Sequence, residues 1–382
     1  MDLTPEDALR INVLLASPIE AVRIDESRMA LFALSEKGEA KVQLNPNCRD
    51  DAYLRRVRET LSSHVLGSPG GYPVYLKRWT RMGQARDEVL ESLLMLGEPE
   101  AVVAVVNATG ITNELARRAW WASQTSDNAR CMLQQAAVVT GKMGPVLADF
   151  LIEFLPFEEE ACDQISTVSL VLQGDLVEAG LRARLWEKGR LKNAYYVGFL
   201  QALPDDLPGG HSAHPEQDRV AQQLAGLLAV DNPFALQLCR LLSPAGQAYL
   251  ACVEAVLKKP SNQDVMVELM HAIEAYSAAL PVGKQRKFDI SDVARKSGVL
   301  AGAADAGLNC TDENAGQCLQ ALFQVLPDDE RRIRAMLFLA LLGEPVLDPV
   351  FSRTDAIGTV MRKKLKPVTE PIHEQIRVLR KS

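Results

Sequence analysis

Leu96-Gly97-Glu98-Pro99 and Leu342-Gly343-Glu344-Pro345 are two copies of one tetrapeptide, and each has the composition of a joint between two helices. The leucine ends an apolar helix, the glycine can adopt a positive φ, and the proline opens the next helix. Other short joints of the same kind are Leu155-Pro156, Leu203-Pro204-Asp205-Asp206 and Leu242-Ser243-Pro244. From about residue 85 onward, the sequence therefore predicts one helix after another with short connections.

An internal match points to a repeat. An offset of 65 residues aligns four identical pairs: Arg117 with Arg182, Trp121 with Trp186, Asn128 with Asn193, and Ala129 with Ala194. This offset fits two helix pairs of about 33 residues, and helical repeats are of about this length. We therefore expect residues 84–345 to form a HEAT-like α-solenoid, in which each helix pair buries its apolar face against its neighbours.

The first 83 residues have a different pattern. Thr4-Pro5-Glu6-Asp7 is a helix start, with a capping threonine and acids in the first turn, and this helix should run to about Ala16. Alternating apolar residues then occur over 22–24, 29–34 and 40–44, separated by polar breaks. These runs predict a three-stranded antiparallel meander, which together with a helix over 47–67 forms a small N-terminal α+β module.

Composition and charge set the broad class. The chain has 382 residues, of which 47% are hydrophobic, 24% charged and 5% aromatic, with a net charge of −7. This is ordinary globular composition, and the negative balance argues against a surface that is basic throughout. Residues 353–382 nevertheless carry eight Lys or Arg against three acids. We expect residues 346–382 to form a separate basic helical segment.

Targeting and redox signals indicate the cytoplasm. The N-terminus lacks a basic region followed by an apolar core, and no apolar run is long enough to span a bilayer. The cysteines are odd in number and none forms a CxxC pair, which favours reduced thiols. They are Cys48, Cys131, Cys162, Cys239, Cys252, Cys310 and Cys318.

The chemistry-bearing residues do not form a catalytic motif. His211 and His214 with Glu216 and Asp218 have metal-ligating side chains, but the surrounding glycines and proline favour an open loop. His64, His271 and His373 are isolated in the sequence, without any GxSxG, SxxK or HExxH pattern, and are expected on helix surfaces or as satisfied core residues. The sequence therefore predicts a protein that is not an enzyme and has no catalytic residue, cofactor or metal.

Residues 49–86 are the most distinctive candidate surface. They contain eight basic residues against three acids, and Tyr53, Tyr72, Tyr75 and Trp79 are interleaved with them. Such a mixture occurs at protein interfaces and also on surfaces that stack single-stranded nucleic acid. A third interpretation is that the arginines face water while the aromatics pack inside. The predicted partner-binding residues are Tyr72, Tyr75, Lys77, Arg78, Trp79 and Arg81.

Three segments make the chain similar to a known family. Leu44-Asn45-Pro46-Asn47-Cys48-Arg49-Asp50, residues 67–79 (GSPGGYPVYLKRW) and residues 193–200 (NAYYVGFL) resemble the DsrS family. This is the sulfur oxidation protein of the dissimilatory sulfite reductase gene cluster, and the resemblance extends over most of the chain. It implies a cytoplasmic accessory role in the oxidation of reduced or stored sulfur, and it transfers no catalytic residue.

The expected function is therefore a non-catalytic accessory protein that binds protein partners of the sulfur oxidation pathway. Two alternatives stay open at this point. The chain could regulate gene expression by binding nucleic acid through residues 49–86. It could also carry sulfur as a thiol or persulfide on an accessible cysteine such as Cys48, which precedes Arg49 near a predicted helix start.

Overall fold

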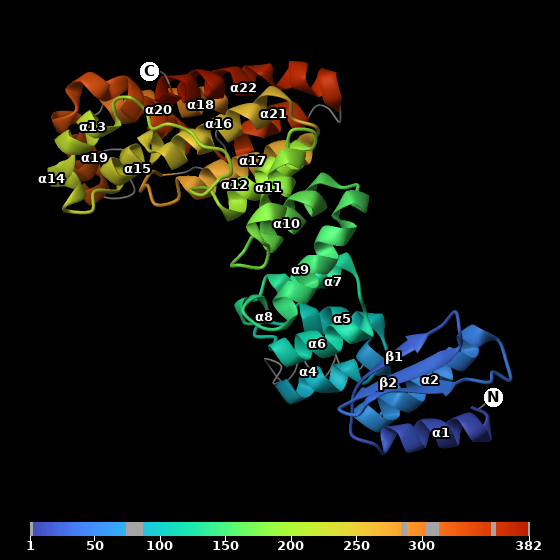
Figure 1. The fold of residues 1–382 in the computed structure, drawn as a ribbon. Helices are drawn as coiled ribbons and strands as arrows, with labels where there is room; N and C mark the ends of the chain where they lie inside the picture. Colours follow the sequence, from blue (N-terminus) through green and yellow to red (C-terminus); the bar gives the residue numbers. More distant parts are fainter. Residues whose placement is uncertain (1–2, 74–86, 284–288, 303–312, 353–356, 381–382) are drawn as a thin grey trace. The chain divides into compact units, whose positions relative to one another are not determined.

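The computed structural model describes residues 3–73, 87–283, 289–302, 313–352 and 357–380 (Figure 1). The described chain is mostly helical (68%), with 21 α-helices and one small sheet. It packs as two compact units: an N-terminal unit of residues 1–156 with 173–176, and a C-terminal unit of residues 157–172 with 177–382. The boundaries expected after residues 83 and 345 each fall inside a unit, and the three-part division stays a prediction.

The first helix begins as its sequence predicts. Helix α1 spans Pro5–Leu15, and the hydroxyl oxygen of the N-cap residue Thr4 accepts a hydrogen bond from the backbone N–H of Asp7. The proline occupies the first helical position, where a missing N–H has no cost, and Glu6 and Asp7 face the positive end of the helix dipole.

The predicted antiparallel meander is confirmed. Strands β1 (Ile19–Asp25), β2 (Ala30–Ser35) and β3 (Gly38–Gln43) form one sheet in the order β1-β2-β3. One face carries Val22, Leu31 and Val42 into a core with α1 and α2 (Asp50–Leu66). On the other face Ala21 and Ala30 are also fully buried, because α4 and α6 pack against β1.

The remaining helices of the N-terminal unit follow with short joints. Gly97 has a φ of 65° and precedes the proline that opens α5, as the tetrapeptide predicts. Each helix packs chiefly against helices one, two or three places away along the chain. The helices are α4 (Asp87–Leu94), α5 (Pro99–Val106), α6 (Asn113–Ala122), α7 (Ser126–Leu133), α8 (Ala136–Val139) and α9 (Met143–Phe154), with η1 (Leu155–Phe157) after them.

The described part of the C-terminal unit consists of helices and 3-10 turns throughout. Its first eight are α10 (Ala161–Val171), α11 (Ala179–Lys188), α12 (Asn193–Ala202), α13 (Gln217–Gln223), α14 (Ala225–Leu228), α15 (Pro233–Leu242), α16 (Pro244–Lys258) and α17 (Gln263–Tyr276). The later elements are α18 (Ile290–Gly302), α19 (Glu313–Val325), η3 (Pro327–Asp329), α20 (Glu330–Ala340), η4 (Glu344–Leu347), α21 (Asp348–Phe351) and α22 (Gly358–Arg380). No helix within the described ranges is long and apolar enough to cross a bilayer.

Packing in the C-terminal unit joins helices that are far apart in the sequence. Helix α20 contacts α15, α17, α18 and α22, and α16 also contacts α22. Every residue from 335 to 342 is buried. Helix α22 therefore contributes to this core. The HEAT-like repeat arrangement is not confirmed, since a repeat array is built from contacts between neighbours.

The second Leu-Gly-Glu-Pro joint differs from the first. Gly343 is extended, with a φ of −170°, and the next residues form η4. The expectation of a positive φ is correct at Gly97 and wrong at Gly343. Because the four residues are identical, the difference comes from the surroundings: Gly97 lies against Ile24 and Leu61, whereas Gly343 lies beside Glu274.

Candidate partner-binding surface

Of the predicted partner-binding residues, Tyr72 is described, whereas Tyr75, Lys77, Arg78, Trp79 and Arg81 lie outside the described residues. Tyr72 is half-buried, and its backbone N–H donates to Glu98 Oε2 over 2.9 Å. Burial raises the pKa of the Tyr72 phenol. A pocket of about 400 Å³ adjoins it, lined by Arg55, Arg58, Glu59, residues 69–73, Glu98 and Glu100.

The described part of segment 49–86 is less basic and less aromatic at its surface than its sequence indicates. Arg56 pairs with Glu59 over 2.8 Å, and Arg58 pairs with Glu26. Tyr53 is fully buried and donates its hydroxyl proton to Asp7, so it cannot stack on a ligand. The burial of Tyr53 supports the interpretation that the aromatics of this segment pack inside while the arginines face water.

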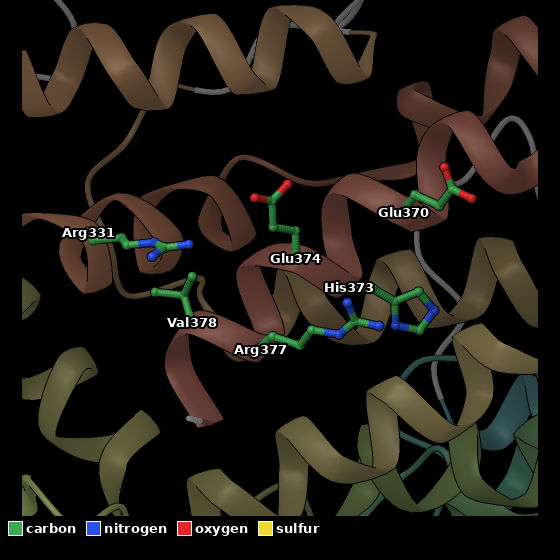
Figure 2. Close-up of a pocket in the computed structure, with 6 residues that line it drawn as sticks. All are labelled: Arg331, Glu370, His373, Glu374, Arg377 and Val378. Atoms are coloured by element: carbon green, nitrogen blue, oxygen red, sulfur yellow. The ribbon is translucent and has the colours of Figure 1, made fainter. Parts of the chain in front are cut away.

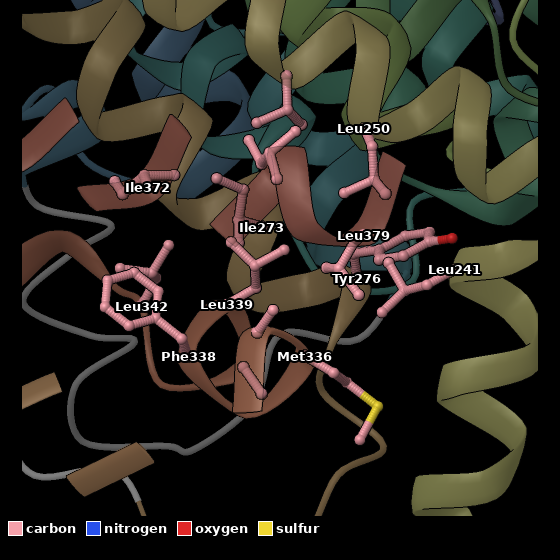
Figure 3. Close-up of a cluster of buried hydrophobic side chains, with 14 of the residues drawn as sticks. Leu241, Leu250, Ile273, Tyr276, Met336, Phe338, Leu339, Leu342, Ile372 and Leu379 are labelled. Carbon is pink, nitrogen blue, oxygen red and sulfur yellow. The ribbon is translucent and has the colours of Figure 1, made fainter. Parts of the chain in front are cut away.

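Helix α22 carries charged side chains on the surface of the C-terminal unit. Its buried side carries Met361, Leu365, Val368, Ile372, Ile376 and Leu379. Figure 3 shows Ile372 and Leu379 among the buried side chains that include Phe338 of α20 and Tyr276 of α17. This packing fixes the helix, so the side chains on its opposite side are held on a rigid support.

The first half of α22 borders a groove of about 400 Å³, which we call the basic groove. One wall is the stripe of α22 side chains at helical spacing, and the other is the end of α16. Four of the lining residues are cations and one is an acid. The lining residues are Leu257, Lys258, Pro260, Thr359, Arg362, Lys363, Leu365, Lys366, Thr369, Glu370 and His373.

The second half of α22 borders a pocket of about 480 Å³, which we call the mixed pocket (Figure 2). Arg331 comes from α20, and Glu370, His373, Glu374, Arg377 and Val378 come from α22. Glu370 and His373 line both cavities, so the basic groove and the mixed pocket form one continuous charged face along the helix.

His373 lies at the junction of the two cavities. Its ring is half-buried, and among the described residues its Nδ1 has no hydrogen-bond partner. Burial lowers the pKa of His373, although the nearby Glu254 carboxylate acts in the opposite direction. Glu254 itself pairs with Lys258 over 2.9 Å and with Arg380. His373 thus lies on the side of α22 that borders the two cavities, and the expectation that it is a helix-surface or satisfied core residue rather than a catalytic base stays a prediction.

Sequence reasoning recognised the basic charge of residues 353–382 but not this face. The signal was present: Thr359, Arg362, Lys366, Thr369 and His373 follow the three-to-four-residue spacing of one helix side. The opposite wall could not be found in this way, because Lys258 and Pro260 precede α22 by about a hundred residues in the sequence.

The cysteines bear on the thiol-carrier alternative. Cys162 is exposed, Cys252 is buried, and Cys48 is half-buried with its thiol directed to the Arg49 carbonyl oxygen over 3.7 Å. Burial raises the pKa of Cys131, Cys162 and Cys239, and at Cys162 the carboxylates of α17 act in the same direction. A raised pKa reduces the thiolate that sulfur transfer requires.

We expect Cys162 to be alkylated by iodoacetamide in the native protein, more slowly than a free thiol of pKa about 8.5, because its thiolate is disfavoured. Cys252 should react only after denaturation, since it is buried in the core of the C-terminal unit. Peptide mass spectrometry over a time course measures both rates, and the denatured chain is the control. Equal native rates at the two cysteines would contradict the structure.

Of the two loop histidines, His211 is exposed and His214 has a structural role. His214 is buried, and its Nδ1 accepts a hydrogen bond from the backbone N–H of Glu216 over 3.1 Å. Its own backbone N–H donates to the Leu242 carbonyl over 2.9 Å. Within the described ranges, no group of three or more His, Cys, Asp or Glu side chains is arranged to hold a metal.

The Tyr72 pocket belongs to the N-terminal unit, and the charged face of α22 belongs to the C-terminal unit. Both are lined by described residues, and the second extends along one helix, α22, that is anchored in the core. Comparison of the chain with protein-family models, curated proteins and solved structures finds no match.

Proposed function

We propose that this chain is a non-catalytic accessory protein that acts by binding a protein partner, with the charged face of α22 as the main binding surface. One observation carries the proposal: the basic groove and the mixed pocket adjoin along a helix whose other side is anchored in the core. Charges held in fixed positions select a partner by complementarity and speed its association.

The resemblance to the DsrS family supports a place in the oxidation of reduced or stored sulfur in the cytoplasm. It depends on residues 44–50, 67–79 and 193–200. The proposed partner is accordingly another protein of that process.

The helical-repeat interpretation is part of this proposal, but only for the N-terminal unit. Helices α4 to α9 pack mainly on near neighbours along the chain, which is the pattern of a repeat array. The long-range packing of α16 and α20 with α22 does not fit such an array. We therefore propose a short HEAT-like stack over residues 87–154.

Reversing two charges of the α22 face, with Lys366→Glu and Arg377→Glu together, should reduce partner recovery by about tenfold or more. The reason is that two attractions become repulsions, and each exposed pair contributes about 0.2–1 kcal/mol. The measurement is quantitative recovery on the tagged full chain from cells grown on reduced sulfur. The matched control reverses Arg184 and Lys188, two exposed cations of α11. Absence of a specific partner, or equal losses in both variants, would refute the proposal.

The two alternatives receive less support from the described residues. Nucleic-acid binding through residues 49–86 is less favoured because Tyr53 is buried and cannot stack on a base. Arg56 and Arg58 are also already paired with acids of the protein. Sulfur carriage on a thiol is opposed by the raised pKa of Cys162, which is the exposed cysteine among the described residues.

A further inference from the structure

We infer that the basic groove binds an extended acidic peptide segment of the protein partner. This inference rests on the proposed function and specifies its chemistry: carboxylate side chains of the partner would lie against Arg362, Lys363 and Lys366 of α22 and Lys258 of α16.

The cations of the groove are only partly neutralised within the protein. Lys258 and Lys366 have side chains that are 60% and 65% exposed. Lys366 reaches Glu370 only over 3.9 Å, and Arg362 donates to the hydroxyl of Thr359 over 3.0 Å. Within the described part of the chain, neither Arg362 nor Lys363 forms an ion pair. A partner that supplies carboxylates would therefore meet positive charge that the protein itself leaves available.

The dimensions of the stripe fit an extended peptide. From Thr359 to His373 an α-helix rises by about 21 Å, at 1.5 Å per residue. An extended chain rises by about 3.3 Å per residue, so about six residues cover this length. The cations at 362, 363 and 366 lie within about one turn of α22, where a small anion could also bind, whereas a peptide of this length also passes Thr369 and Glu370 and reaches His373.

The lining favours a peptide over nucleic acid. No Phe, Tyr or Trp lines the groove, and its one aromatic ring is the half-buried imidazole of His373 at its end, so it offers no row of rings for successive bases to stack on. Pro367 lies within α22 and has no N–H, which leaves the Lys363 carbonyl without its usual helical donor. A peptide brings backbone N–H groups that can donate to such a carbonyl, and a phosphate backbone brings none.

The positions of Glu370 and Glu374 determine where the bound segment should be acidic and where it should be basic. Glu370 stands at the end of the basic groove and Glu374 lies in the adjoining mixed pocket. Both would repel a carboxylate and attract a cation. The segment that fits the whole face is therefore acidic over Arg362 to Lys366 and basic where it passes Glu370 and Glu374.

The test is fluorescence anisotropy of the full chain with a labelled peptide made of a run of glutamates followed by lysine. We expect binding at low ionic strength that weakens with added salt, because the charges are exposed. Reversing Arg362, Lys363 and Lys366 to glutamate should weaken it by about tenfold or more, and Glu370→Gln should strengthen it about twofold to fivefold. Circular dichroism verifies that each variant folds. The matched control reverses Arg184 and Lys188 of α11 and Arg190 directly after it, and should change affinity less than about twofold.

Competition identifies the ligand. If inorganic phosphate at equal charge displaces the peptide with higher affinity, the groove binds a free anion and the inference is overturned. If a single-stranded oligonucleotide does so, the groove binds nucleic acid and the inference is likewise overturned. Equal losses in the α22 and α11 variants would also overturn it. If the peptide fails to bind while Lys366→Glu/Arg377→Glu still abolishes partner recovery, this inference fails and the proposed function stands. If partner recovery is unaffected, the proposed function fails first.

Discussion

Replacing Asp7 with alanine is expected to lower the free energy of unfolding of the N-terminal unit by about 3–5 kcal/mol, the cost of leaving two or three buried donors unpaired. The Asp7 carboxylate is fully buried and accepts hydrogen bonds from Tyr53 Oη (2.5 Å), Asn45 N (2.7 Å) and Asn45 Nδ2 (3.1 Å). These bonds join α1, α2 and the segment that follows β3. Urea unfolding of the full chain, followed by hydrogen exchange of residues 3–66, measures this unit specifically.

The matched control is Glu6→Ala, which removes an acid from the neighbouring position of the same helix. The Glu6 side chain is 65% exposed and pairs with Arg10 of the same helix, so its loss should change the free energy of unfolding by about 0.5 kcal/mol or less. Equal losses in the two variants would mean that the Asp7 network does not stabilise the unit.

The same carboxylate gives the stability of this unit a pH dependence. Burial alone would raise the pKa of Asp7, but the hydrogen bonds from Asn45 and Tyr53 outweigh it and lower the pKa below its usual value. A depressed folded-state pKa contributes stability above the unfolded pKa of about 3.9, and this contribution is lost as the pH falls through the folded pKa. The acid unfolding of an Asp7→Asn variant should therefore depend less steeply on pH below about 4.

The second large effect is expected in the C-terminal unit, where Phe338→Ala should lower the free energy of unfolding by about 3–5 kcal/mol. Phe338 is 2% exposed and belongs to α20, which is surrounded by α15, α17, α18 and α22. Truncation leaves a cavity that four helices must collapse to fill. Hydrogen exchange of residues 330–342 during urea unfolding measures the effect.

Phe157→Ala is the matched control, since it is the same chemical change in the same unit at a side chain that is 78% exposed. It should alter the free energy of unfolding by no more than about 0.5 kcal/mol. A loss at Phe157 as large as that at Phe338 would place the core of the unit elsewhere.

The N-terminal elements were predictable because their signals are local. Thr4 and Pro5 fix the start of α1, and the alternation of Val22, Leu31 and Val42 with their neighbours fixes the meander. These patterns depend on residues close together in the chain. These local patterns do not predict the burial of Ala21 and Ala30, because the helices that cover them follow much later in the sequence.

The packing of the C-terminal unit could not be predicted in the same way. Nothing near Lys258 in the sequence indicates that it will form one wall of a groove with α22. Gly97 and Gly343 show the same limit at the level of the backbone, since identical tetrapeptides adopt different conformations in different surroundings. Of the predicted partner-binding residues only Tyr72 is described, so that surface stays a prediction.

The dependence of the C-terminal core on α22 has a consequence for synthesis on the ribosome. Helices α15, α16, α18 and α20 emerge first, and the part of their apolar surface that α22 covers stays exposed until residues 358–380 have been made. From the end of α16 to the end of α22 the chain grows by about 120 residues, which takes roughly 6 to 24 seconds at about 5–20 residues per second. The N-terminal unit can close its own core during that time. The nascent chain therefore passes through a stage in which one half is folded and the other presents apolar helices to chaperones.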